Sequence, residues 1–161
     1  KGIVILDLRT LSSYQKGHVP GSIFTNYSKD GWRTKNSEGT VGMLPPVEQI
    51  SSLIGGLGID NEDHVVLIPF GTSSSKMGTA TRVYWTLKVL GHDKVSILNG
   101  GMAAYKKAKK PKYPLETESR SPQQKYELHL FQRRNLACPT KWRRPHQHDS
   151  LLLLPKLISV R

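Results

Sequence analysis

The sequence has very little cysteine and no long apolar run. Its 161 residues include one cysteine, Cys138, so an internal disulfide framework is excluded and a reducing, cytoplasmic compartment is favoured. A membrane-spanning helix needs ~20 apolar residues, and no segment approaches that length. The run SLLLLPKLISV near the end is short and is broken by Pro155. The chain begins at Lys1 with no charged-then-apolar leader, which leaves a missing N-terminal segment open.

Acidic residues are scarce only in the last third of the chain. The net charge is +12. Residues 1–105 hold ten basic and eight acidic residues (+2), whereas residues 106–161 hold fourteen and four (+10). Because the basic segment shows no regular apolar period, we interpret it as a solvated or disordered tail. A nucleic-acid-binding tail is the weaker hypothesis, since only the charge favours it.

Metal binding is not expected either. Cys138, His146, His148 and Asp149 form a C-x7-H-x-H pattern followed by a carboxylate, and this spacing matches no common zinc site. A Ser-His-Asp triad is also not indicated, because no nucleophile elbow accompanies the serines and histidines. We therefore expect no metal and no cofactor.

Apolar patterns along residues 1–110 alternate between strand and helix. The expected strands are short β-branched or apolar runs at 2–9, 19–27, 64–70 and 94–101. The expected helices show a start signal or an apolar stripe, at 12–18, 45–59, 79–90 and 102–110. Residues 28–45 are polar and contain three glycines, so we expect a loop there. This alternation predicts an α/β domain with a mostly parallel sheet and helices on both faces.

The loop PFGTSSSKMGTATR (69–82) is the main candidate site. It follows an expected strand and precedes an expected helix, where open α/β sheets bind ligands and where helix N–H groups attract anions. The residues that could bind an anion are Gly71, Thr72, Ser73, Ser74, Ser75, Gly78 and Arg82. The alternative is a flexible connection whose serines only contact water. Arg82 could face an anion, but a structural ion pair with a carboxylate such as Asp7 is favoured. His18, in GHVPGS, is expected to fix a turn rather than to act in catalysis.

Several segments, in this order, resemble the rhodanese-like sulfurtransferase family over residues 2–115. They are VILDLR (4–9), YQKGHVPGSIFTNY (14–27), LGIDNEDHVVLI (57–68), RVYWTLKVLGHDKVSILNGG (82–101) and Tyr105. The structural motif residues within them are Asp7, Arg9, His18, Gly21, Gly100 and Gly101. The resemblance implies a three-layer domain with a central, mostly parallel five-stranded sheet.

The resemblance also implies a chemistry that this sequence departs from. Active members carry a cysteine at the end of the fourth strand, and its thiolate takes a sulfane sulfur from thiosulfate or mercaptopyruvate. Here Pro69 or Phe70 falls at that position, and serine cannot form a persulfide. The pattern is closer to the cysteine-free N-terminal half of two-domain sulfurtransferases. We therefore expect this chain alone to be inactive.

The implied organisation has three parts. Residues 1–115 form the rhodanese-like domain, 116–126 a linker and 127–161 the basic tail, for which a truncated or frame-shifted remnant is one hypothesis. The expected partner is a second, cysteine-bearing rhodanese domain or a sulfur-acceptor protein, with no membrane and no nucleic acid. The alternative function is a stand-alone, non-catalytic module that binds a protein or a small anion.

Overall fold

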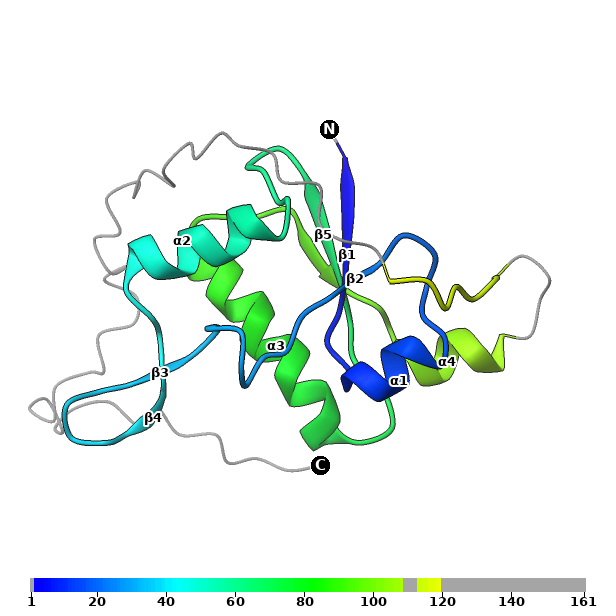
Figure 1. The fold of residues 1–161 in the computed structure, drawn as a ribbon, viewed down its shortest axis with the longest axis horizontal. Coiled ribbons are helices and arrows are strands. Elements are labelled where there is room, and N and C mark those ends of the chain that lie inside the picture. Colours follow the sequence, from blue (N-terminus) through cyan, green and yellow to red (C-terminus); the bar gives the residue numbers. More distant parts are fainter. Residues whose placement is uncertain (1, 109–112, 120–161) are drawn as a thin grey trace, which may run out of the picture.

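A four-stranded parallel sheet forms the centre of the domain. The computed structural model describes residues 2–108 and 113–119. The sheet order is β2-β1-β5-β6, from Ile23–Phe24, Ile3–Asp7, His64–Ile68 and Val95–Ile97 (Figure 1). Every strand pair in it is parallel, and β1 pairs with β5 over its whole length, from Ile3 opposite His64 to Asp7 opposite Ile68. The parallel sheet predicted from the alternating pattern is therefore confirmed.

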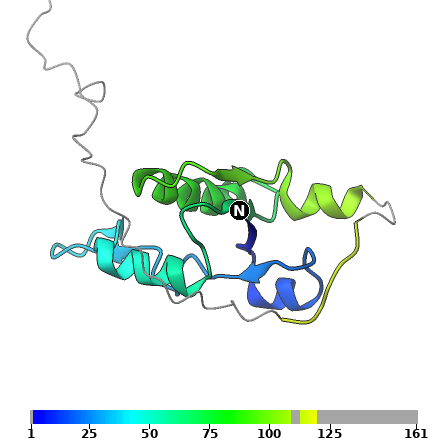
Figure 2. The same cartoon turned by 90° about the horizontal axis from the view of Figure 1, so that it is seen from above.

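Helices cover both faces of the sheet. Helices α2 (Val47–Gly56) and α3 (Ser74–Val89) lie on one face, and α1 (Leu11–Gln15) and α4 (Gly101–Lys107) lie on the other (Figures 1 and 2). Both views agree on this arrangement, so the predicted three layers are confirmed.

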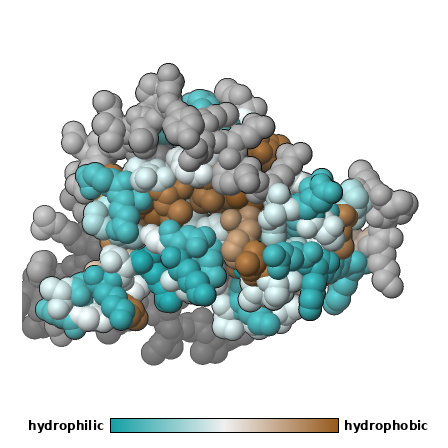
Figure 3. All heavy atoms as spheres, in the orientation of Figure 1, coloured by the Kyte–Doolittle hydropathy of each residue, from teal (hydrophilic) through white to brown (hydrophobic). Residues whose placement is uncertain are grey.

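The main hydrophobic core lies between the sheet and the α2–α3 layer. Ile50 and Ile54 from α2 and Val83 and Leu87 from α3 are all fully buried in the same cluster as Leu67 of the sheet. These helical positions repeat at intervals of four, which places them on one face of each helix. Apolar surface is also visible between α2 and α3 in Figure 3, bordered by hydrophilic side chains.

The structure differs from the sequence expectations in three places. The described sheet has four strands rather than five. Residues 28–45, expected to be a loop, contain a short antiparallel hairpin of β3 (Thr34–Lys35) and β4 (Val41–Met43). Helix α3 begins at Ser74, five residues before the expected start, because the Ser73 side chain caps it.

A short segment after α4 returns to the body of the domain. His18 and Glu116 form an isolated antiparallel bridge, with N–H···O distances of 2.9 Å in both directions. Glu116, the first residue of the expected linker, therefore still contacts the domain. Within the same residues, no helix is both long and apolar enough to cross a membrane.

Candidate functional site

The loop after β5 is closed by backbone hydrogen bonds to the start of α4. Pro69 is buried, and its carbonyl accepts from the Met102 amide at 2.9 Å. The carbonyl of Phe70 accepts from the Ala103 amide at 3.1 Å. Two of the first amides of α4, which would otherwise lack an intrahelical partner, are therefore already used. The carboxyl end of β5 delivers no thiol, and its first two loop carbonyls are bound to α4.

Glycines make this closure possible. Gly71 has φ +77°, and a Cβ atom there would lie 1.9 Å from the carbonyl oxygen of Gly100. Gly101 has φ +56°, and a Cβ atom there would lie 2.5 Å from the carbonyl oxygen of Pro69. Only glycine fits both the backbone angles and the available space. Close backbone contacts at Gly71, Gly100 and Gly101 thus hold the ends of the neighbouring strands β5 and β6 together.

The hydroxyl-bearing residues of the loop lie on the surface at the start of α3. Residues 72–75 are exposed. The Ser73 Oγ accepts from the Lys76 amide at 3.4 Å and lies 3.3 Å from the Ser75 Oγ. The Lys76 ammonium sits 4.8 Å from the centre of the Phe70 ring. The structure therefore gathers the predicted anion-binding residues Thr72, Ser73, Ser74 and Ser75 beside one lysine, and anion binding itself stays a prediction.

Arg82 lies two turns further along α3 and does not pair with Asp7. Its guanidinium donates to the carbonyl of Gly42 in β4 and stacks 4.4 Å from the centre of the Trp85 ring. The expected ion pair between Arg82 and Asp7 is therefore wrong. Arg82 instead connects the β3–β4 hairpin to α3. Gly78 is exposed within α3, and its carbonyl accepts from the Thr81 hydroxyl at 2.8 Å.

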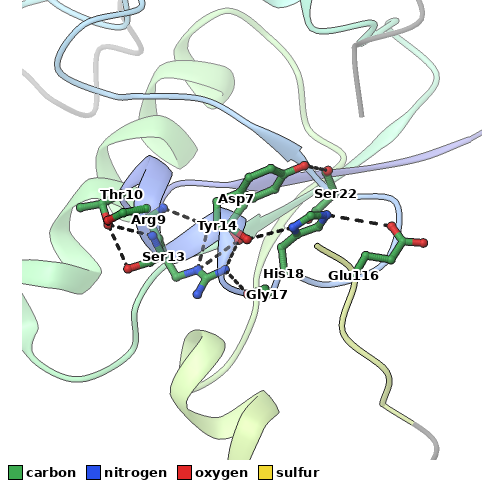
Figure 4. Close-up of polar contacts among 10 residues, drawn as sticks. Asp7, Arg9, Thr10, Ser13, Tyr14, Gly17, His18, Ser22 and Glu116 are labelled. Carbon is green, nitrogen blue, oxygen red and sulfur yellow. Dashed lines mark hydrogen bonds and ion pairs between the residues drawn. The ribbon is translucent and has the colours of Figure 1, made fainter. Parts of the chain in front are cut away.

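The carboxylate of Asp7 pairs with Arg9 instead. Both side chains are buried, and the Arg9 Nη2 donates to Asp7 Oδ2 at 2.7 Å while its Nε donates to Oδ1 at 3.0 Å (Figure 4). The same Nη2 donates to the Gly17 carbonyl at 2.9 Å. This bidentate arrangement, with a further hydrogen bond to a carbonyl, offsets part of the desolvation cost of a buried ion pair. It holds the end of β1 against the loop that precedes β2.

His18 is buried in the turn that the sequence predicted it to fix. Its ring stacks on Tyr14 with centroids 3.8 Å apart, and its Nδ1 lies 3.0 Å from the Tyr14 carbonyl oxygen (Figure 4). Its Nε2 lies 4.0 Å from Glu116 Oε2, and the other described contact of that carboxylate is a hydrogen bond from the Gly21 amide at 2.9 Å. His18 and Gly21 therefore both contact Glu116 of the returning segment.

Sequence reasoning missed the residues that fasten this returning segment. Tyr105 donates to the Pro114 carbonyl at 3.0 Å and packs edge-on against Tyr113, with centroids 5.4 Å apart. Leu115 lies directly over Gly17. The local pattern carried no signal for these contacts, since 113–119 has neither a helical nor a strand period. The expected helix at 102–110 and the resemblance at Tyr105 indicated that this end of α4 is structured, but not what it contacts.

Other candidate chemistry lies away from the loop or outside the described residues. Within residues 2–108 and 113–119, no group of three or more histidine, cysteine, aspartate or glutamate side chains could hold a metal ion. Cys138, His146, His148 and Asp149 lie outside the described residues. Burial lowers the pKa of His92, which lies in the turn between α3 and β6. The loop after β5 therefore remains the candidate site on geometric grounds.

Comparison with known proteins identifies the family. Residues 1–108 match the rhodanese-like domain. The chain is 33% identical over 96 residues to thiosulfate/3-mercaptopyruvate sulfurtransferase 2 of Arabidopsis thaliana, covering 60% of this chain and 26% of that protein. It is 36% identical over 100 residues to the thiosulfate sulfurtransferase of Cricetulus griseus, covering 61% and 31%. The chain thus spans about a third or less of these relatives.

Solved structures agree with this assignment. A 3-mercaptopyruvate sulfotransferase of Escherichia coli superposes with a TM-score of 0.57 at 26% identity, covering 74% of this chain and 45% of that one. The 3-mercaptopyruvate sulfurtransferase from Leishmania major gives a TM-score of 0.58 at 22% identity, which shows the shared fold, and it covers 74% and 33%. With the matched residues, the parallel-sheet fold and these relatives in agreement, the chain belongs to the rhodanese-like domain family.

Proposed function

We propose that this chain is the non-catalytic rhodanese-like domain of a thiosulfate/mercaptopyruvate sulfurtransferase, and that it forms one wall of a substrate cleft completed by a cysteine-bearing rhodanese domain. The observation that carries the proposal is the loop after β5. It presents Pro69 and Phe70 at the strand end and contains no cysteine.

The physical reason for inactivity is the lack of a thiol at the end of β5. A reactive cysteine needs a thiolate stabilised by a helix N-terminus or by nearby N–H groups. The N-terminus of α3 follows the loop, but the residues from Pro69 to Ser75 include no cysteine whose thiolate it could stabilise. A hydroxyl cannot replace the thiol, because sulfur–sulfur bond formation requires a sulfur nucleophile.

The surface beside the loop supports a role in binding rather than in bond making. Ser74 and Ser75 lie at the positive end of the 16-residue helix α3, next to Lys76. Thiosulfate and mercaptopyruvate are both anions, and such a helix end favours negative charge. This domain would therefore orient an anionic sulfur donor toward a thiol supplied by the partner domain.

A cyanide-dependent thiocyanate assay with thiosulfate tests the inactivity. The purified chain is expected to show no turnover above the uncatalysed background, and Cys138→Ser is expected to leave that background unchanged. Turnover that disappears in Cys138→Ser would overturn the proposal, because it would show that this chain carries its own sulfur-accepting thiol.

Reconstitution separates the proposed wall from a stand-alone binding module. A cysteine-bearing rhodanese domain from a two-domain sulfurtransferase is assayed with and without the purified chain. The proposal expects the KM for thiosulfate to fall when the chain is present. The fall should be smaller with the Lys76→Gln variant than with Lys106→Gln, the control, because Lys106 is an exposed lysine on the opposite helical layer. An unchanged KM, together with direct capture of a sulfur-acceptor protein, would instead favour the stand-alone module.

A further inference from the structure

We propose that Asn99 is a spontaneous deamidation site, and that the isoaspartate formed there opens the contact between loop 69–71 and turn 98–101. Among the five asparagines of the sequence, Asn99 alone is followed by glycine. It lies between the end of β6 and the start of α4, and its side chain is exposed. The inference does not depend on the proposed function, because it concerns the chemistry of this turn alone.

The nucleophile of the reaction is the backbone nitrogen of Gly100. Within the described residues, the Gly100 amide makes no hydrogen bond, and glycine has no side chain to shield its nitrogen. Two other asparagines provide a contrast. The Asn26 Oδ1 accepts from the Ser28 amide at 2.9 Å, and the Asn36 Oδ1 accepts from the Thr40 amide at 2.7 Å. Their side chains are held in turns, whereas that of Asn99 has no described hydrogen bond.

The reaction needs no reagent other than water. The Gly100 nitrogen attacks the Cγ of Asn99 and loses its proton, the carbon–nitrogen bond to the side-chain amide breaks, and ammonia leaves. The product is a five-membered cyclic imide. Water then adds to one of its two carbonyl carbons and breaks the bond to the ring nitrogen. One opening gives aspartate with the original backbone, and the other gives isoaspartate, in which the backbone runs through the former side-chain carbon.

The surrounding turn has no room for the extra backbone carbon of isoaspartate. Leu98 donates to the Leu67 carbonyl and Gly101 donates to the Leu98 carbonyl, both at 2.9 Å. The position of a Cβ at Gly71 is 1.9 Å from the Gly100 carbonyl oxygen, so the two loops are in direct backbone contact. A longer backbone at residue 99 must therefore displace the start of α4 or loop 69–71. Deamidation would therefore alter the backbone of the candidate site irreversibly as the protein ages.

Peptide mapping by mass spectrometry tests the site. The full chain is incubated at mildly alkaline pH, and the gain of about 1 Da that converts an amide to an acid is followed at each asparagine. Because glycine leaves the attacking nitrogen open, deamidation at Asn99 is expected to be about tenfold faster than at Asn26 or Asn36. A rate at Asn99 equal to or below theirs would overturn the proposed site.

Two variants separate the charge change from the backbone change. Asn99→Gln removes the reactive amide, and the aged protein is expected to retain its fresh melting temperature. Asn99→Asp carries the charge on an ordinary backbone and is expected to melt close to the unaged wild type. Aged wild type that contains isoaspartate is expected to melt below both. If it melts with them, the turn tolerates the longer backbone and the structural consequence is refuted.

Discussion

Substituting Gly71 by alanine tests whether loop 69–71 is pinned against turn 98–101. An L-residue with left-handed backbone angles costs ~1–2 kcal/mol. The new Cβ would also lie 1.9 Å from the Gly100 carbonyl oxygen, so backbone must move. Such overpacking typically costs ~1–3 kcal/mol. The expected loss in unfolding free energy is therefore about 2–5 kcal/mol, a large share of the ~5–15 kcal/mol of a typical domain.

Gly39→Ala is the matched control for this substitution. Gly39 has φ +82°, close to the +77° of Gly71, but nothing lies within 4 Å of a Cβ built there. It should therefore lose only the ~1–2 kcal/mol of backbone strain. Urea unfolding, with a slope of ~1–3 kcal/mol per molar for small proteins, resolves the difference as a shift of the midpoint. Equal losses in the two variants would refute the direct backbone contact and, with it, the closed form of the candidate site.

Three further predictions concern single polar side chains. Asp7→Asn should lower the unfolding free energy by ~3–5 kcal/mol in urea, because it leaves a buried guanidinium unpaired; Glu62→Gln, which breaks an exposed pair with Lys94, should cost ~0–1 kcal/mol, and similar losses would contradict the assigned role. Burial lowers the pKa of His92 from 6.5, so the unfolded chain binds its proton first: stability is retained above pH 6.5 and falls as the pH drops from there toward the lowered folded-state pKa. Thermal melts at several pH values should show a weaker dependence of stability on pH in His92→Gln. An unchanged dependence would show that another group causes it. Glu116→Ala removes the acceptor of the Gly21 amide, so limited proteolysis of the segment 113–119 should become faster, while unchanged cleavage would show that the backbone bridge alone holds it.

The fold was predictable because its signals are local. The run HVVLI, buried by neighbours on both sides, appears as the central strand β5. The helix after it follows from an apolar stripe that includes Val83 and Leu87, both fully buried. The start of this helix was predicted five residues late because the serines were interpreted as loop, whereas Ser73 acts as the N-cap.

The partners of the charged residues could not be predicted in the same way. Both Arg9 and Arg82 are compatible with Asp7 in sequence, and the choice depends on tertiary geometry: Arg9 lies two residues from Asp7, whereas Arg82 reaches Gly42, forty residues away in a hairpin of weak strand propensity. The contacts of Glu116 were missed for the same reason. They join residues almost a hundred positions apart and have no periodic pattern.

Intact-mass spectrometry after thiosulfate treatment tests the central claim most directly. The claim is that the β5 loop, with Pro69 at the strand end, cannot carry a sulfur atom for transfer. The account predicts that the mass of the chain stays unchanged after excess donor is removed. A stable gain of one sulfur atom on Cys138 that is discharged by cyanide would contradict it.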